Sequence, residues 1–230
     1  AKYVATATLE ASLDVASMAK NSTKVFILEV MGRHAGWIAA SSALAQVNGH
    51  SAPHIILLPE RPIKTELMID KIQASVEKYG YCTIVASEGI KNAENEFIAQ
   101  SGNKDAFGHQ QLGGVAPTLS QMIQQELQLK NHWAVADYLQ RSAHHIVSKT
   151  DLDQAYQLGK AAIDAAVNQE NNIMMAIKRT NNHPYTWEIT SAPLNEVANI
   201  EKTLPDNYIS NDGMHVTEEC INYLAPLITG

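Results

Sequence analysis

Apolar positions along the chain fall into two kinds of run: short continuous ones, and longer ones in which apolar residues recur every three or four positions. The continuous runs predict buried strands at residues 25–30, 54–58, 81–86 and 132–136. The periodic runs predict helices over residues 5–19, 35–46 and 65–79, and around Leu119, Ile123 and Leu127. Gly80 follows the third of these helices and suits its C-cap.

The pattern is less regular in the rest of the chain. Residues 91–114 are polar and rich in glycine, which predicts a loop or excursion. Thr150 is expected to cap a further helix. The apolar positions of that helix are Leu152, Tyr156, Gly159, Ile163 and Val167. Beyond it we predict strands at 173–177 and 186–189, then an irregular segment from 191 and a short helix near 217–224.

Strands that alternate with helices of this length indicate βαβ units, and therefore an α/β fold with a mostly parallel sheet flanked by helices. Such sheets bind ligands at the carboxyl ends of their strands. Three polar clusters follow predicted strands: Met31-Gly32-Arg33-His34, Ser87-Glu88-Gly89 and Asp137-Tyr138-Leu139-Gln140-Arg141. Because neighbouring parallel strands end at the same edge of a sheet, we expect the three clusters to lie together there.

Composition narrows the class of protein. The 230 residues are 45% apolar and 18% charged, an ordinary balance for a globular protein. The net charge of -7 argues against general binding to nucleic acid or to an anionic membrane. No apolar run is long enough to span a bilayer. Neither the two cysteines nor the nine histidines have the spacing of metal ligands. We therefore expect a cytoplasmic protein with reduced cysteines and no metal site.

The three clusters carry side chains suited to a phosphorylated sugar. The guanidinium groups of Arg33 and Arg141 can grip phosphate oxygens. Glu88 can accept hydrogen bonds from sugar hydroxyls, and Tyr138 can donate one to phosphate or sugar. Each also has an ordinary alternative: an arginine that caps a sheet edge, a glutamate in a salt bridge, and an exposed arginine beside a half-buried tyrosine.

The amino-acid sequence of these clusters resembles that of the phosphofructokinase family. The resemblance covers nearly the whole chain and rests on four segments: Lys24–Trp37, Val85–Gly89, Tyr138–Ser142 and Ala198–Lys202. The continuation Ala35-Gly36-Trp37 and the tyrosine at 138 resemble the pyrophosphate-dependent branch of the family.

The resemblance implies an activity and a set of site residues. Members of this branch transfer a phosphoryl group from pyrophosphate to the 1-hydroxyl of fructose 6-phosphate. The matching positions that would bind the sugar phosphate are Met31, Gly32, Arg33, Glu88, Tyr138 and Arg141. Arg33 would also act in catalysis, by holding charge near the transferred group. Two further family positions reach the sugar phosphate from a neighbouring subunit, and they fall on Lys24 and His132, which implies a homo-oligomer.

The family's Thr-Ile-Asp-Asn-Asp run, which holds the catalytic aspartate, and its donor-binding Gly-Gly-Asp turn do not occur in these residues. The resemblance therefore implies a C-terminal portion without turnover of its own, with the Mg²⁺ site elsewhere. Residues 1–141 would form the fructose 6-phosphate domain. Residues 142–190 would return to the donor domain, and residues 191–230 would form a C-terminal extension that packs back.

Two other functions remain open at this point. One is an ATP-dependent 6-phosphofructokinase of the same fold, because the residues that specify the donor are not in this sequence. The other is a non-catalytic module that binds or senses a sugar phosphate at the same edge of the sheet.

Overall fold

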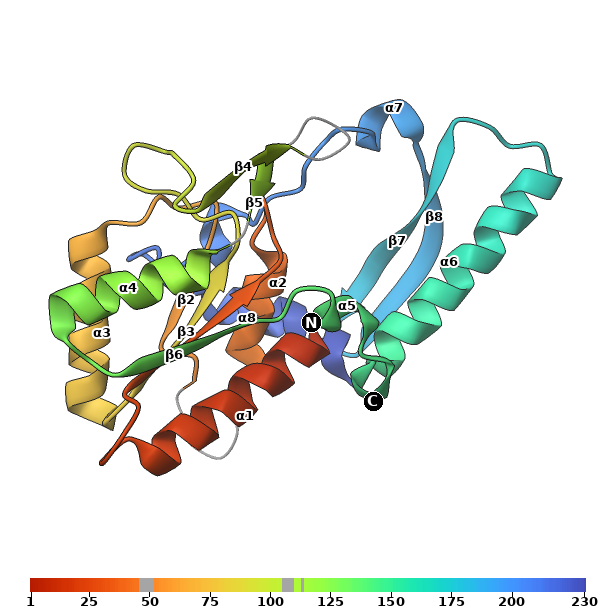
Figure 1. Cartoon of the computed structure of the whole chain (residues 1–230). Coiled ribbons are helices and arrows are strands. Elements are labelled where there is room, and N and C mark those ends of the chain that lie inside the picture. Colours follow the sequence, from red (N-terminus) through yellow and green to blue (C-terminus); the bar gives the residue numbers. More distant parts are fainter. Residues whose placement is uncertain (46–51, 105–109, 113) are drawn as a thin grey trace.

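Sixteen helices and strands are described, joined by shorter 3₁₀ turns, in a computed structural model that describes residues 1–45, 52–104, 110–112 and 114–230 (Figure 1). The α-helices are α1 Lys2–Met18, α2 Trp37–Ser41, α3 Thr65–Tyr79, α4 Val115–Leu127, α5 Leu139–Ser142, α6 Lys149–Val167, α7 Leu194–Val197 and α8 Glu218–Leu224. The strands are β1 Val25–Val30, β2 Ile55–Leu57, β3 Cys82–Ser87, β4 Gln100–Lys104, β5 Gln110–Leu112, β6 Asn131–Val135, β7 Ile173–Asn182 and β8 Tyr185–Pro193.

The main sheet has four strands in the order β2-β3-β1-β6, and every pair in it is parallel. Val25 at the start of β1 pairs with Cys82 of β3 and with Asn131 of β6. At the other end, Val30 pairs with Ser87 and Glu29 with Val135. The carboxyl ends of β1, β3 and β6 therefore lie level, which confirms the predicted parallel α/β fold.

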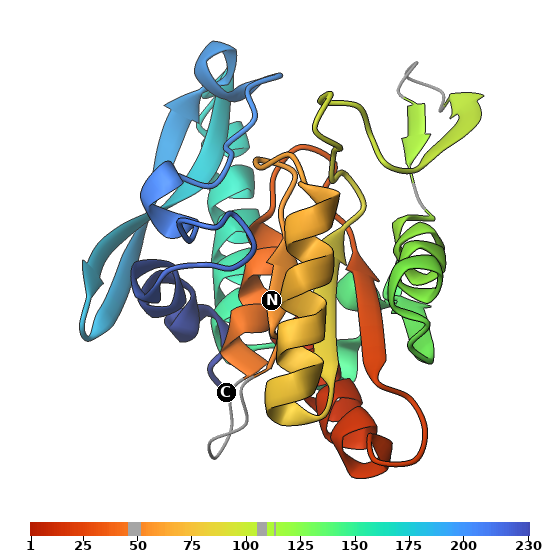
Figure 2. The ribbon, with the colours of Figure 1, turned by 90° about the vertical axis from the view of Figure 1, so that its left-hand side faces the viewer.

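Helices cover both faces of this sheet (Figure 2). On one face, Met68 and Ile72 of α3 and Leu119 and Ile123 of α4 are fully buried against the strands. On the other face the cover comes from α1, α2 and α8. The alternation of side chains along β1 explains the two layers, because Ile27 faces the first group and Leu28 the second.

A buried carboxylate in β1 anchors α4. Glu29 is only 2% exposed, and its Oε2 accepts a hydrogen bond of 2.8 Å from the backbone N–H of Ala116. The site lies at the first turn of α4, where backbone N–H groups have no partner within the helix. Burial raises the pKa of this carboxyl above its ordinary value, while the backbone N–H groups oppose that shift.

Several predicted bounds need correction. The helix predicted over 35–46 begins only at Trp37 and ends at Ser41, followed by a 3₁₀ turn over Ser42–Ala45; Gln46 lies outside the described residues. The hydroxyls of Ser41 and Ser42 donate to carbonyls three residues back, at 2.6 Å each, and so favour the tighter turn.

The segment 91–114 is not simply a loop, because β4 and β5 form an antiparallel pair within it. The polar sequences of both strands lack the alternation that would have predicted them. Residues 105–109 and 113 of this segment lie outside the described part of the chain.

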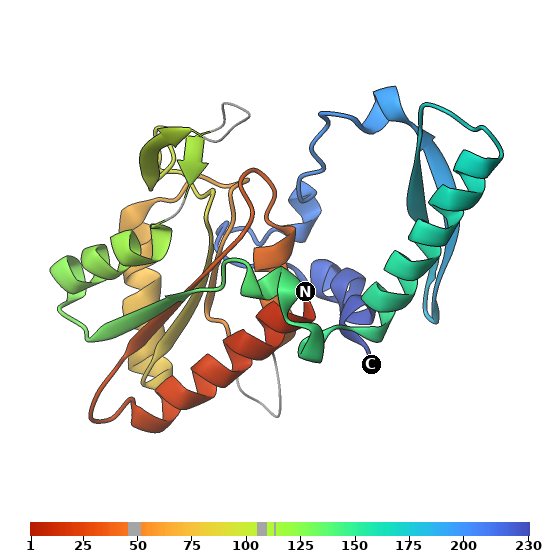
Figure 3. The same ribbon diagram turned by 45° about the vertical axis from the view of Figure 1, so that its right-hand side comes forward.

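The strands predicted at 173–177 and 186–189 are longer and do not join the main sheet. They are β7 and β8, an antiparallel hairpin that packs on α6 beside the sheet-containing part (Figure 3). Polar residues such as Lys178 and Glu188, which pair across the hairpin, concealed the strand ends.

The predicted cap of α6 was wrong by two residues. Ser148, not Thr150, caps the helix, since its Oγ accepts from the N–H of Asp151 at 2.9 Å. Thr150 lies inside the first turn and donates to the carbonyl of Pro226 instead.

Both cysteines, Cys82 and Cys220, are buried free thiols. Burial raises the pKa of each to about 12.

Within the described ranges, no helix is long and apolar enough to cross a membrane. Nor do the described histidines, cysteines and carboxylates form a group of three that could hold a metal ion.

His54 gives the fold a pH dependence. Its Nδ1 accepts from the N–H of Thr83 at 2.9 Å, and burial, helped by the nearby His215, lowers its pKa to about 4 from 6.5. A histidine with a lowered pKa binds fewer protons in the folded state, so the free energy of unfolding falls as pH drops from 6.5 towards 4.

We expect His54→Gln to lose less stability than the parent chain over this pH window, by on the order of 1–2 kcal/mol. Urea unfolding at several pH values measures the difference. The raised pKa of Glu29 makes the free energy of unfolding depend on pH in the opposite direction. Glu29 is present in both proteins, so its contribution cancels in the comparison. Parallel curves of stability against pH would contradict the assignment.

Candidate functional site

The three polar clusters meet at the carboxyl edge of the main sheet, and the turn after β1 is their centre. The backbone N–H of Met31 donates to Oε1 of Gln140, and the next N–H, of Gly32, donates to Oε1 of Glu88, both at 3.3 Å. Two successive N–H groups thus reach side chains that follow the two neighbouring strands. The sequence analysis expected this meeting because neighbouring parallel strands end at the same edge, and the structure brings the clusters together.

Gly32 is required by the geometry of this turn. Its φ is +145°, and a Cβ there would lie 2.6 Å from Oγ of Ser87 and 2.8 Å from the carbonyl oxygen of Ala35. The Ser87 hydroxyl donates to the carbonyl of Gly32. Only a residue without a side chain allows β3 to hold the turn in this way.

Gly89 makes the closest approach in the site. A Cβ at this position would lie 1.8 Å from the carbonyl oxygen of Arg33 and 2.7 Å from that of Gly32. The backbone after β3 therefore packs directly on the backbone that carries Arg33. This contact fixes the position from which the Arg33 side chain extends.

Arg33 itself is half-buried, and no hydrogen bond or ion pair joins its guanidinium to another described residue. Glu88 is also half-buried, with one oxygen on the N–H of Gly32. Its other oxygen has no hydrogen bond to any of the residues that the structure describes. A cation and a carboxylate thus lie at the ends of neighbouring strands, and the guanidinium and one carboxylate oxygen are available to bind a ligand.

Tyr138 and Arg141 lie at the same edge, after β6. Both are exposed, and the guanidinium of Arg141 stacks on the ring of Tyr138, 4.5 Å from its centre. Gln140, between them in sequence, donates to the carbonyl of Asp137 at 2.8 Å and accepts from Met31. It therefore ties the short helix α5 to the turn after β1.

Lys24 and His132 lie away from this group. Lys24 directly precedes β1, and His132 is exposed near the start of β6, so both are at the amino edge of the sheet. A strand of six residues, roughly 20 Å, separates that edge from Arg33. The structure does not bring these two residues to the site of their own chain.

Three residues of the site were not singled out from the sequence: Ser87, Gly89 and Gln140. All lie inside the quoted clusters. The signal for Gly89 was its place directly after a strand and a carboxylate, where a glycine permits close backbone contact. Nothing in the spacing indicated that Gln140 would turn inward while Arg141 stays exposed.

The arrangement suits a small anionic ligand that also carries hydroxyl groups. Arg33 and Arg141 provide permanent positive charge in a chain whose net charge is -7. Glu88 provides an acceptor for hydroxyls close to the turn, and the exposed ring of Tyr138 carries a hydroxyl donor.

Gly89→Ala tests the close contact. We expect it to lower the free energy of unfolding by at least about 3 kcal/mol, because backbone atoms of Gly32 and Arg33 must move. The matched control is Gly159→Ala on α6, where an added Cβ meets nothing within 4 Å. That change should stabilise the helix by about 0.5–1 kcal/mol. Equal urea midpoints for the two variants would contradict this geometry.

Comparison with known proteins gives a consistent result. The family described as Phosphofructokinase matches residues 4–166. The whole chain is 56% identical to a pyrophosphate–fructose 6-phosphate 1-phosphotransferase of Halomonas elongata and 52% identical to one of Methylococcus capsulatus, spanning 55% of each. The crystal structure of a pyrophosphate-dependent phosphofructokinase from Nitrosospira multiformis superposes with a TM-score of 0.88 at 48% identity, over all of this chain and 54% of that one.

Proposed function

This chain belongs to the phosphofructokinase family, and from that premise we propose that it forms the fructose 6-phosphate-binding half of a pyrophosphate-dependent phosphotransferase. The observation that carries the proposal is the edge of the sheet where Arg33, Glu88 and Arg141 follow three adjacent parallel strands. The identity to two named phosphotransferases, over the full length of this chain, supports the choice of pyrophosphate as donor.

The residues take the following roles in this proposal. Arg141 binds the 6-phosphate, with the Tyr138 hydroxyl as a further donor. Glu88 accepts hydrogen bonds from sugar hydroxyls, and the backbone of Met31 and Gly32 lines the sugar. Arg33 holds charge near the transferred phosphoryl group, where electrostatic stabilisation contributes most to such reactions.

The donor half of the site lies outside these residues in our proposal. The chain spans 55% of the length of the two named relatives, and pyrophosphate, Mg²⁺ and the catalytic base would be held by the remainder. Among the described residues, no group of three histidines, cysteines or carboxylates could hold Mg²⁺. The chain alone should have essentially no turnover. A glycolytic role in the cytoplasm follows from the same proposal.

Lys24 and His132 would act on a neighbouring copy. Their place at the amino edge, remote from Arg33, supports a role towards another subunit rather than towards their own site. His132 and Trp133 on the edge strand β6 are exposed and accessible to a second chain.

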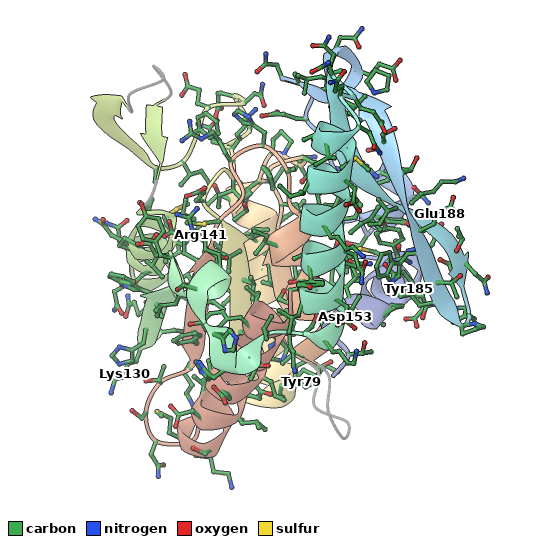
Figure 4. All side chains as sticks on the ribbon, turned by 90° about the vertical axis from the view of Figure 1, so that its right-hand side faces the viewer. Tyr79, Lys130, Arg141, Asp153, Tyr185 and Glu188 are labelled. Atoms are coloured by element: carbon green, nitrogen blue, oxygen red, sulfur yellow. The ribbon has the colours of Figure 1, made fainter. Side chains whose placement is uncertain are left out.

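Residues 142–190 would pack on the donor domain. The helix α6 lies towards the viewer in Figure 4, and four apolar side chains that recur along it are largely exposed. Their exposed fractions are 51% for Leu152, 72% for Tyr156, 66% for Ile163 and 76% for Val167. A stable helix in water normally buries such a row, which supports a missing partner surface.

Calorimetric titration with fructose 6-phosphate tests the site. We expect saturable binding to this chain, and a loss of affinity of about 10- to 100-fold in Arg33→Ala and in Arg141→Ala, since each removes a charge-assisted contact with phosphate. Lys160→Ala, which removes an exposed cation on α6, is the matched control and should bind as the parent does. Unchanged affinity in both arginine variants would rule out this edge as the sugar-phosphate site.

The apolar row predicts self-association of the isolated chain. We expect Tyr156→Ser combined with Ile163→Ser to reduce it, as measured by sedimentation velocity at several concentrations, because the two changes interrupt the row at its centre. Lys160→Ser on the same helix is the control. A parent chain that stays monomeric at all concentrations would argue against the proposed docking surface.

A further inference from the structure

The C-terminal part of the chain returns across the turn that carries Arg33. After α7, residues 198–204 run from the hairpin back to the sheet (Figure 1); we call this segment the strap. Nδ1 of His34 lies 2.5 Å from Oε1 of Glu201, and the indole N–H of Trp37 donates to the carbonyl of Lys202 at 2.7 Å. Both contacts fall within four residues of Arg33.

Glu60 joins the strap to the turn. This residue follows β2, and its Oε1 accepts two backbone hydrogen bonds of 2.9 Å, from Gly36 in the turn and from Leu204 in the strap. One carboxylate oxygen therefore holds two segments that are distant in sequence. Glu60 is partly buried, and a carboxylate that accepts from two N–H groups forms bonds stronger than those between neutral groups.

The fit around this carboxylate is tight. A Cβ at Gly36 would lie 2.8 Å from Oε2 of Glu60 and 2.7 Å from Cδ2 of Leu58. Oε2 is buried and has no hydrogen-bond partner among the described residues. A buried carboxylate oxygen without a partner is costly, so the two hydrogen bonds to Oε1 must offset the cost of placing Oε2 there.

The far side of the strap is anchored as well. Leu204 is 3% exposed in the core beneath α2 and α8. The ring of Trp37 packs edge-on against Tyr208, with ring centres 6.1 Å apart, and against Tyr223 at 5.7 Å. The strap thus connects the turn to the buried core beneath α2 and α8.

We propose that the strap positions Arg33, and that Glu60 is the positioning residue through which it acts. The role of Arg33 rests on the function proposed above; the mechanical link does not. Gly89 confines the Arg33 backbone from the β3 side, and the strap confines residues 34–37 from the other. Because the described residues offer the guanidinium no hydrogen bond or ion pair, the backbone is the part of Arg33 that its neighbours hold, and it fixes the point from which the side chain extends. An error of 1 Å in such a group costs up to about 100-fold in rate.

The experiment compares three variants. Glu60→Ala removes both backbone bonds, while Glu60→Gln keeps a carbonyl oxygen that can accept them. Trp37→Phe removes only the bond to Lys202 and keeps an aromatic ring against Tyr208, so it remains informative if Glu60→Ala folds poorly. The control is Arg61→Ala, which removes an exposed ion pair with Asp206 next to Glu60 without touching the turn.

Two readouts are needed. Hydrogen exchange at the amides of Gly36 and Leu204 reports on the link itself. The affinity for fructose 6-phosphate, by calorimetry, reports on its consequence. We expect exchange at both amides to rise at least about tenfold and affinity to fall about tenfold in Glu60→Ala, with smaller changes of the same sign in Trp37→Phe. Glu60→Gln should restore both to within about threefold, and Arg61→Ala should match the parent.

The loss of affinity caused by Glu60→Ala should also depend on the presence of Arg33. In an Arg33→Lys background, which retains a charge for weak binding, Glu60→Ala should lower affinity by less than about twofold, because coupled residues are not additive. Equal losses in both backgrounds would overturn the positioning role, as would raised exchange without a change in affinity. Unchanged hydrogen exchange in both Glu60→Ala and Trp37→Phe would overturn the proposal that the strap holds the turn. A parent chain that does not bind fructose 6-phosphate would refute the proposed function, while the exchange data would still decide the link.

Discussion

The parallel pairing of β1 with β3 on one side and β6 on the other is the constraint on which the candidate site depends. It places three strand ends at one edge, so that the turn after β1 can receive Glu88 from one neighbour and Gln140 from the other. A shift of one residue in either pairing would turn alternate side chains to the opposite face and break both contacts. The position of the turn that carries Arg33 therefore depends on the pairing of β1 with β3 and β6, two strands that lie far from Arg33 in the sequence.

The strands of the main sheet were predictable because the sequence signals there are local and strong. The β1 run of six apolar or buried positions ends directly in Gly32 and Arg33, and α3 has a regular apolar face closed by Gly80, whose φ is +86°. The family could be recognised for the same reason, since these segments are distinctive. The candidate residues after β1, β3 and β6 were found together, as expected from strand-end geometry.

Other features could not be predicted because they depend on contacts between distant segments. The polar ends of β7 and β8 are stabilised by each other and by α6, so their own sequences do not reveal strands. The inward turn of Gln140 needs the Met31 N–H as its partner, and the two hydrogen bonds of Glu60 need the strap. For Gln140 and Glu60 the decisive partner lies more than twenty residues away, and for the hairpin it is the facing strand, so a periodicity within one segment reveals none of these contacts.

The burial of both thiols has a practical consequence for spectroscopy. With pKa values of about 12, Cys82 and Cys220 hold almost no thiolate at neutral pH, and their sulfur atoms lie inside the core. Maleimide and iodoacetamide reagents react with the thiolate, so the natural chain should resist alkylation. A single cysteine introduced on the surface would then accept a fluorophore or spin label selectively. Probes for distance measurements can therefore be attached without first replacing the native cysteines.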